Sequence, residues 1–265
     1  MSGSDLHWSR FTPAERLLRF SVYLLSVAAI VFSIRTVEVI PEFILDAPHQ
    51  MMDLLSRMWP MDTGHYAGGV HQALVETLHV ATLGTIGTAL MAVPVALAAS
   101  NRILPWRMLN MAARLILVSS RSVNTLVWAL LFVAVFGPGA MAGVMAIAFR
   151  SIGFVGKLLS EALDETSSGP VEALKAAGAP WMSILVKGYW PQVQPAFWSI
   201  ILFRWDINVR ESAVLGLVGA GGIGMALDTA LNLFYWNRVS LILFTIFLVV
   251  IAMEVLVTFI RKRII

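Results

Sequence analysis

Five polar side chains stand close together within one apolar stretch of the C-terminal half. They are Arg204, Asp206, Asn208, Arg210 and Glu211. At 100° per residue, a helix places Arg204, Asn208 and Glu211 on one face and brings Asp206 within reach of Arg210. Arginine can donate two parallel hydrogen bonds to a carboxylate or a phosphorus oxyanion. These residue types therefore suit ion pairing or transient contact with an anion.

Three more polar residues interrupt other apolar stretches: Arg121 and Asn124 in one, and Arg150 in another. Together the stretches hold four arginines and two acids, an excess of two positive charges. Charges at membrane depth are costly and usually face a bundle interior or an aqueous path. Two interpretations stay open. The groups either pair to hold helices in register, with Arg121 or Arg150 satisfying Glu211 or Asp206, or they line a path for an anion.

The stretches that carry these residues are membrane-spanning by composition. The chain has 265 residues, 58% of them hydrophobic and 13% charged, whereas a soluble domain has about 25% charged residues. Its mean hydropathy is +0.79. A span needs about 20 apolar residues. The predicted spans are 19–40, 77–99, 111–136, 140–161, 192–217 and 239–260. The fold class is therefore all-α, a polytopic membrane bundle of about six helices.

The first apolar run is either a membrane anchor or the core of a cleaved signal peptide, since Arg10, Arg16 and Arg19 precede it. We expect an anchor, because the run is long and no convincing small-residue cleavage site follows. Basic residues concentrate in every second loop, which predicts that both termini are cytoplasmic. The net charge of +3 belongs to these loops and does not indicate nucleic acid. The outer connection 41–76 contains MMDLL, which suits a short interfacial helix.

The most informative soluble segment is 167–191, SSGPVEALKAAGAPWMSILVKGYWP. Its pattern predicts two short helices joined by a turn on the cytoplasmic face. Pro170 suits the first helical position, and Gly178 suits a helix end. We expect Gly188 and Pro191 to break the second helix before the fifth span begins.

This segment resembles the coupling loop of bacterial ABC importer permeases, whose signature is Glu-Ala-Ala, three residues, Gly, nine residues, Ile, one residue, Leu-Pro. The matching ATPase-coupling residues are Glu172, Ala173, Leu174, Ala177 and Gly178. Leu174 replaces the second Ala, while Gly188 and Trp190 replace the Ile and the Leu. The resemblance implies docking onto an ATP-hydrolysing subunit. The sequence contains no Gly-x-x-x-x-Gly-Lys-Ser/Thr loop, so we expect no cofactor in this chain and ATP and Mg on the partner ATPase.

A longer run, 203–224, narrows the family further. FRWDINVRESAVLGLVGAGGIG is similar to the fifth-helix signature of phosphonate-uptake permeases, and segments 127–146, 157–165 and 169–179 resemble that family in order. The resemblance covers about 75–265 and implies a fold like that of a type I ABC importer permease. It also implies a permease core over 71–265, preceded over 1–70 by a cytoplasmic segment, the first transmembrane helix and a periplasmic connection.

Residues 219–224, GAGGIG, match the dinucleotide pattern Gly-x-Gly-x-x-Gly, but an apolar membrane helix and not a strand is predicted before them. Glycines here favour a tight turn and close backbone packing where the fifth span ends. If these glycines have a role in transport, we expect them to form a periplasmic gate. The gate residues would be Gly219, Gly221, Gly222 and Gly224.

The resemblance implies a homodimer in the lipid bilayer of the bacterial inner membrane, with two ATPase subunits and a periplasmic substrate-binding protein as partners. The expected function is translocation of phosphonate or a related phosphorus oxyanion such as phosphite. The chain itself would be a non-catalytic subunit. The expected translocation path consists of Arg121, Asn124, Arg150, Arg204, Asp206, Asn208, Arg210 and Glu211.

Two other classes of protein compete with this interpretation. An ion-gradient-driven secondary anion transporter could use six helices and buried acids, but it has no need of a coupling loop. A membrane enzyme would need a nucleophile, a general base or a metal set gathered at membrane depth. The chain has no cysteine, and its histidines form no ligand pair, so we expect neither catalysis nor a metal site.

Overall fold

The computed structural model describes residues 11–37, 40–104 and 106–264, which excludes Arg10. Every regular element in these ranges is a helix. Five of them are long and apolar enough to cross a membrane, or six if one bent pair counts as a single span. The predicted all-α membrane bundle is thus confirmed. The chain divides into two units, residues 1–55 and 56–265, so residues 56–70 belong to the same unit as residues 71–265.

The first unit holds α1 (Pro13–Thr36) and most of α2 (Pro41–Met58). Thr12 and Glu15 form a capping box that fixes where α1 begins. The expectation of a short MMDLL helix was too narrow, because α2 covers 18 residues and includes Pro48. Polar residues recur along α2 at helical spacing, as in the hydrogen bond between Gln50 and Asp46. This amphipathic period favours a helix over the whole segment.

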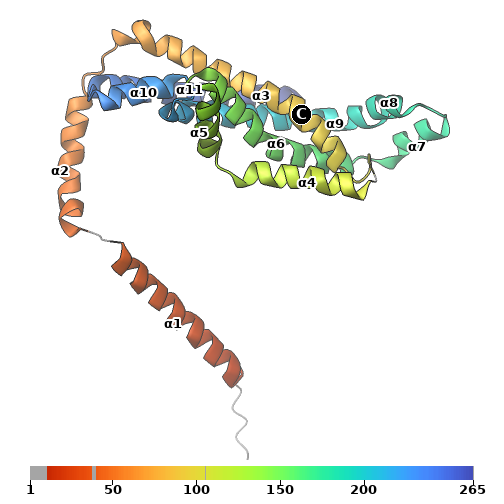
Figure 1. Cartoon of the computed structure of the whole chain (residues 1–265), viewed down its shortest axis with the longest axis horizontal. Coiled ribbons are helices and arrows are strands. Elements are labelled where there is room, and N and C mark those ends of the chain that lie inside the picture. Colours follow the sequence, from red (N-terminus) through yellow and green to blue (C-terminus); the bar gives the residue numbers. More distant parts are fainter. Residues whose placement is uncertain (1–10, 38–39, 105, 265) are drawn as a thin grey trace, which may run out of the picture. The chain divides into compact units, whose positions relative to one another are not determined.

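The second unit is built around three long helices, α3 (His71–Ala99), α6 (Ala140–Asp164) and α9 (Trp190–Leu215), which lie side by side (Figure 1). A five-residue π-helical turn, η1 (Tyr66–Val70), leads into α3. Helix α6 packs against α3, α4, α5 and α9. Glycines permit this close approach. A Cβ on Gly84 of α3 would lie 2.6 Å from the Ile147 side chain of α6.

The predicted third span, 111–136, is not one straight helix. It consists of α4 (Arg107–Ser122) and α5 (Thr125–Phe136), which meet at an angle of 93°. Asn124 has an extended backbone and its side chain accepts a hydrogen bond from the Leu126 N–H, so it caps α5. A capping residue between two apolar runs explains the break, which hydropathy alone does not reveal.

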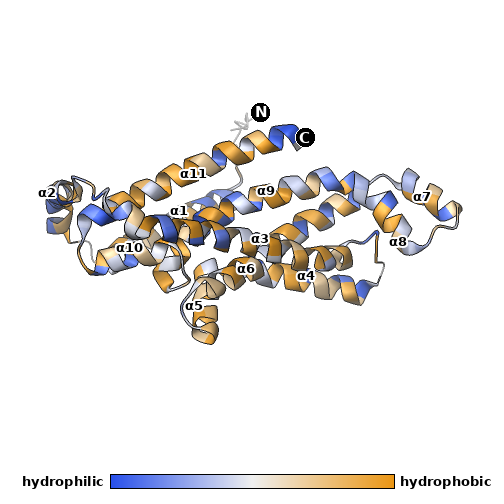
Figure 2. Ribbon diagram, turned by 90° about the horizontal axis from the view of Figure 1, so that it is seen from above, coloured by the Kyte–Doolittle hydropathy of each residue, from blue (hydrophilic) through white to orange (hydrophobic). Residues whose placement is uncertain are grey.

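The C-terminal part contains a helix that the sequence analysis missed. After α9 and the 3-10 turn η3 (Gly216–Val218), the chain forms α10 (Ile223–Asn232) before α11 (Trp236–Ile264). Large apolar side chains of α5 and α11 remain exposed, including Leu130, Phe244 and Phe247. Figure 2 shows hydrophobic colour over α5 and along α11, with hydrophilic colour at the C-terminal end of α11. Such apolar outer faces suit a lipid environment.

Candidate functional site

The polar face of α9 forms a continuous hydrogen-bonded chain with α6 and α3. Arg204 is 2% exposed and its Nε donates to the Ser151 hydroxyl at 2.8 Å. That hydroxyl donates to Asn208 Oδ1 at 3.3 Å, and Asn208 Nδ2 donates to the Thr85 hydroxyl at 2.8 Å. Each of these four side chains has a hydrogen-bond partner within the series, as burial at membrane depth requires.

Glu211 lies at the centre of the charges. Its Oε2 accepts hydrogen bonds from Arg204 Nη2 at 3.1 Å and from the Thr125 hydroxyl at 3.0 Å. Its Oε1 lies 3.2 Å from Arg150 Nη1. The predicted pairing of Arg150 with Glu211 is therefore confirmed. We call the residues of this network the charge cluster: Thr125, Arg150, Ser151, Arg204, Asn208 and Glu211.

Asp206 and Arg210 form the predicted pair one turn apart on α9. Asp206 is 7% exposed, and its Oδ1 has no hydrogen-bond partner within the part of the chain that the structure describes. The Arg210 side chain is 45% exposed. This pair therefore has one buried member and one member that can reach a ligand or solvent.

A cavity of about 360 Å³ opens beside the charge cluster, where α4 and α5 meet. We call it the arginine cavity, because Arg150 and Arg210 both line it. Its lining residues are Asn124, Thr125, Leu126, Arg150, Arg210, Glu211, Val214 and Leu215. Four of the residues predicted for a translocation path thus share one cavity, and two of those four are arginines. An anion entering it would find two cationic side chains and a hydroxyl.

Arg121 belongs neither to the charge cluster nor to the lining of the arginine cavity, and it pairs with neither Glu211 nor Asp206. It lines a separate cavity of about 250 Å³ together with Arg114, Lys157 and Glu161. The 93° break separates Arg121 on α4 from α5. Of the two arginines that the sequence offers as partners for the acids of the fifth span, Arg150 is the one that pairs.

Thr85, Thr125 and Ser151 are members or neighbours of this network that the sequence analysis missed. Single hydroxyl residues in apolar helices commonly bond to their own backbone, as Thr85 also does to Ala81 at 2.7 Å. Their partners here lie on other helices, so spacing along the chain gives no signal for them.

Residues 167–191 form the helical hairpin that the sequence predicts, and we name this segment the coupling loop after the loop that it resembles. It contains α7 (Ser168–Ala176), α8 (Trp181–Ile184) and the π-helical turn η2 (Leu185–Tyr189). Gly178 has φ +70°, in the left-handed region that favours glycine at a helix end. Pro170 is the third residue of α7 rather than the first. Gly188 and Pro191 do not interrupt the chain's helical path, because η2 continues directly into α9.

Two departures from the permease signature pack against each other. Gly188 is buried in η2, and a Cβ there would lie 3.2 Å from Leu174 Cδ1 and 3.4 Å from Val171 Cγ2. The larger residue at 174 thus lies against the smallest possible residue at 188. This contact explains why the loop can carry both substitutions at once.

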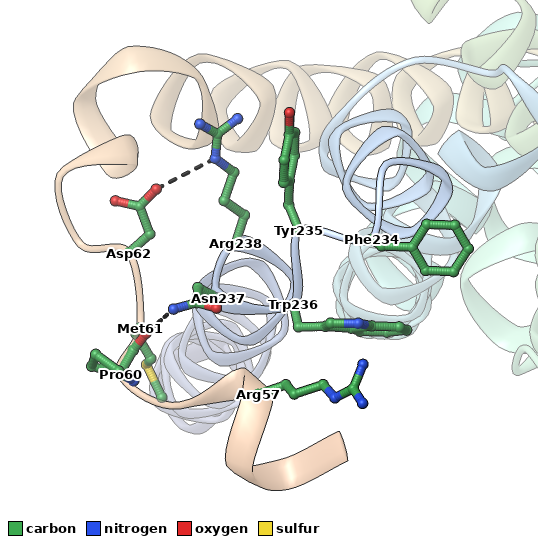
Figure 3. A pocket seen from close by; sticks show the side chains of 9 residues that line it. All are labelled: Arg57, Pro60, Met61, Asp62, Phe234, Tyr235, Trp236, Asn237 and Arg238. Carbon is green, nitrogen blue, oxygen red and sulfur yellow. Dashed lines mark hydrogen bonds and ion pairs between the residues drawn. The ribbon is translucent and has the colours of Figure 1, made fainter. Parts of the chain in front are cut away.

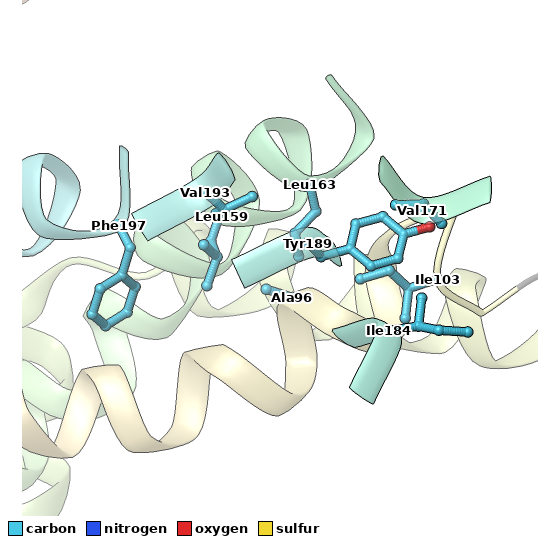
Figure 4. Packing of buried hydrophobic residues seen from close by; sticks show 9 residues of the cluster. All are labelled: Ala96, Ile103, Leu159, Leu163, Val171, Ile184, Tyr189, Val193 and Phe197. Atoms are coloured by element: carbon cyan, nitrogen blue, oxygen red, sulfur yellow. The ribbon is translucent and has the colours of Figure 1, made fainter. Parts of the chain in front are cut away.

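An apolar cluster joins the coupling loop to the long helices (Figure 4). Val171, Ile184 and Tyr189 from the loop pack with residues of α3, α6 and α9. The ends are tied by polar contacts: Gln192 accepts from the Ser167 N–H at 2.9 Å, and Ser100 donates to Asp164 at 2.6 Å. The outer surface stays open, and Glu172, Ala173, Ala177 and Gly178 are all exposed.

The glycine segment forms a tight, closely packed turn, as predicted. Gly219, Gly221 and Gly222 have φ of +83°, +83° and +75°. A Cβ on Gly222 would lie 2.6 Å from Thr77 Oγ1, and one on Gly224 would lie 2.4 Å from the Ala213 carbonyl oxygen. No strand precedes this turn among the described residues, so it lacks the context of a dinucleotide site.

Another cavity lies away from the charge cluster. It has a volume of about 690 Å³ and is formed by residues 57–62 and the turn between α10 and α11 (Figure 3). Arg238 Nε lies 3.3 Å from Asp62 Oδ2, and Asn237 donates to the Pro60 carbonyl at 2.8 Å. These contacts tie the chain before η1 to the start of α11. None of the predicted site residues lines this cavity.

No metal site is found among the residues that the structure describes, because no three His, Cys, Asp or Glu side chains gather there. Arginines, amides and hydroxyls make up most of the polar groups around Glu211. These groups are the ion-pairing and hydrogen-bonding partners of the Glu211 carboxylate and their neighbours.

Comparison with solved structures defines the fold. The fold is that of type I ABC importer permeases. A chain of the inward-facing MetNI methionine ABC transporter matches with a TM-score of 0.64 and 20% identity, over 74% of this chain and 96% of that chain. A chain of an amino acid ABC transporter matches with a TM-score of 0.62 and 20% identity, over 75% of this chain and 95% of that chain.

Sequence comparison gives the family. Residues 92–265 match the model of the binding-protein-dependent transport system inner membrane component, and the chain belongs to this family of multi-pass inner membrane proteins. The phosphite transport system permease protein PtxC of Stutzerimonas stutzeri is 37% identical over 77% of this chain and 72% of its own length. The phosphate-import permease protein PhnE of Mycolicibacterium smegmatis is 36% identical over 88% of this chain. This chain spans only 44% of that relative's length.

Proposed function

We propose that this chain is the substrate-translocating subunit of an ATP-driven importer for a phosphorus oxyanion. The observation that carries the proposal is the presence of Arg150 and Arg210 on one cavity beside the charge cluster. The relatives named above are described as carrying phosphite and phosphate. These ions and phosphonates share a tetrahedral phosphorus with anionic oxygens, which suits arginine donors.

The proposed assembly is a homodimer with two ATPase subunits and a periplasmic substrate-binding protein. ATP and Mg would bind the ATPase subunits, which dock on the coupling loop. The exposed side of that loop supports the docking, because Trp181 and Met182 are 53% and 60% exposed beside the small residues Ala173 and Ala177. An apolar, low-relief surface of this kind suits burial against a protein partner. Both termini would be cytoplasmic, with the basic end of α11 on the same side.

Movement would pass from the coupling loop to the arginine cavity through α6 and α9. Both helices contribute to the apolar cluster at the loop, and they carry Arg150 and Arg210. When the ATPases close, a shift of the loop would move these two helices as packed bodies. Gly219, Gly221, Gly222 and Gly224 are proposed as the periplasmic gate. Anion contacts in the path must be transient, since a tight site would slow release.

The test is uptake by cells that lack other importers for phosphorus oxyanions. The chain is expressed with the ATPase and the binding protein that are encoded beside its gene. Uptake of labelled phosphite, methylphosphonate and phosphate is then measured. We expect uptake of at least one of them that persists when ionophores collapse the ion gradients but ATP is maintained. Cells with the same partners and without this chain serve as the control. Uptake that follows the ion gradient, or no uptake of any phosphorus oxyanion, would contradict the proposal.

A further inference from the structure

The carboxylate of Glu211 has two sides with different surroundings. Oε2 is held by Arg204 at 3.1 Å and by Thr125 at 3.0 Å, and these two partners are 2% and 5% exposed. Oε1 contacts Arg150 at 3.2 Å, and Arg150 lines the arginine cavity. One oxygen is therefore fixed in the bundle interior, while the other contacts a residue that a ligand could reach.

Arg150 has donor capacity that Glu211 does not use. Its side chain is 29% exposed, and its Nε, which is itself buried, has no hydrogen-bond partner among the described residues. A guanidinium offers five N–H donors in a planar fork. The 3.2 Å contact with Oε1 also shows that an anionic oxygen fits against this guanidinium.

The ion pairs of Glu211 with Arg204 and with Arg150 differ in the free energy that their separation would cost. Separation of Glu211 from Arg204 would leave a buried cation without its counter-charge, which is strongly unfavourable. Separation of Arg150 from Glu211 would leave the buried pair intact and would turn a partly exposed arginine toward the cavity. Partly exposed ion pairs contribute little free energy. Arg150 is therefore the member of the cluster that can change partners.

We propose that Glu211 is a resident competitor for the transported anion. Its Oε1 occupies the position on Arg150 that one oxygen of a phosphorus oxyanion takes during transport. The anion enters the arginine cavity and binds Arg150, with Arg210 nearby, while Glu211 stays with Arg204. Return of Arg150 to Oε1 then releases the anion. This inference rests on the proposed function for the identity of the anion.

This exchange of Arg150 between Glu211 and the anion explains how a path lined by arginines can release its substrate. Arginine binds phosphorus oxyanions well, and a site that held them tightly would block passage. A carboxylate that competes for the same donors weakens the site without removing its positive charge. The strength of the competition is set by how firmly Arg204 and Thr125 hold Glu211.

The experiment uses the absence of cysteine from the chain. Val214 lines the arginine cavity and is 47% exposed, so Val214→Cys introduces a single thiol there. Its modification by a neutral methanethiosulfonate is measured in the full-length chain in membrane vesicles, at increasing inorganic phosphate or phosphite. A neutral reagent is used because changes in local charge do not alter its approach. We expect both anions to slow the modification.

Three second-site variants then test the exchange. The half-protecting concentration is the anion concentration that halves the rate of thiol modification. Glu211→Gln should lower it by up to about fivefold, the effect expected from loss of a partly exposed ion pair. Thr125→Val removes one donor to Glu211 and no charge, so it should shift that concentration by less than Glu211→Gln does. Arg150→Gln should abolish protection. Phe234→Cys, 71% exposed in the cavity of Figure 3, is the control thiol and should show no protection.

Unchanged half-protecting concentrations in both Glu211→Gln and Thr125→Val would overturn the proposal, and so would protection that persists in Arg150→Gln. If Glu211→Gln does not fold, Thr125→Val decides, because it leaves every charge in place. Protection without cellular uptake would contradict the proposed function and leave the exchange standing. Cellular uptake without protection in the parent Val214→Cys chain would contradict the exchange and leave the proposed function standing.

Discussion

The charge cluster and the coupling loop are built in opposite ways. In the charge cluster, polar groups face inward and satisfy one another, and Arg204 and Asn208 are 2% and 0% exposed. In the coupling loop, apolar residues such as Val171 and Ile184 face inward, and small residues are left on the outside. A surface for a protein partner needs shape and low relief, whereas an ion path needs charges held at fixed positions. Helices α6 and α9 carry residues of the charge cluster and also pack against the coupling loop.

The largest expected effect separates partner docking from folding. Gly178→Trp places a bulky side chain on the exposed loop at a left-handed position, where an ordinary residue costs about 1–2 kcal/mol. We expect co-purification with the ATPase subunit and cellular uptake to be lost. Gly137→Trp is the matched control, because Gly137 also has a positive φ, +82°, and open space around it. Equal loss of association in both variants would contradict a specific docking role for the loop.

Substitution of the two arginines of α9, Arg204 and Arg210, should distinguish a structural role from a role in transport. Arg204→Gln leaves Glu211 without its buried partner, and we expect the free energy of unfolding to fall by about 3 kcal/mol. Arg210→Ala removes a side chain that is 45% exposed but leaves the buried Asp206 without its cation. We expect it to insert with a smaller loss of stability than Arg204→Gln, while uptake falls about tenfold through loss of local attraction for the anion. Thermal unfolding in detergent and uptake are measured on both. Normal uptake by Arg210→Ala would remove the functional interpretation of the charges, and its failure to fold would favour a structural one.

The smallest expected effect concerns the paired departures at 174 and 188. Gly188→Ile forces a side chain against Leu174 and should destabilise the protein by about 1–3 kcal/mol. Leu174→Ala opens space at the same contact and should also destabilise. The double variant should recover about 1 kcal/mol relative to the sum of the two, because neighbours in contact are not additive. Thermal unfolding of the four proteins measures this, and simple additivity would show that the contact does not couple them.

Local patterns predicted most of the elements and some of the contacts. Helical spacing was enough for the Asp206–Arg210 pair and for the shared face of Arg204, Asn208 and Glu211, because both partners lie on one helix. Gly178 was also predictable, since a helix end imposes a left-handed residue. The break at Asn124 and helix α10 were missed, because each lies within or beside apolar residues that hydropathy merges with a neighbouring span.

Contacts between helices were less predictable. The sequence offered Arg121 and Arg150 as equal partners for the acids of α9, and only packing places Arg150 against Glu211 at 3.2 Å. The roles of Ser151 and Thr85 likewise depend on how α3, α6 and α9 are rotated about their axes. A hydroxyl in an apolar helix has no sequence signature that distinguishes a local backbone bond from a contact with another helix.

The sequence by itself determined that the chain spans a membrane, that it is helical and that residues 167–191 form a helical hairpin. These properties follow from solvent transfer and local hydrogen bonding, which act within some 20 residues. The tertiary structure alone decided which charges meet, which of them stay buried and which reach a cavity. Those outcomes depend on the packing of helices far apart in the chain, and a difference of a few ångströms separates a structural ion pair from a site that an anion can enter.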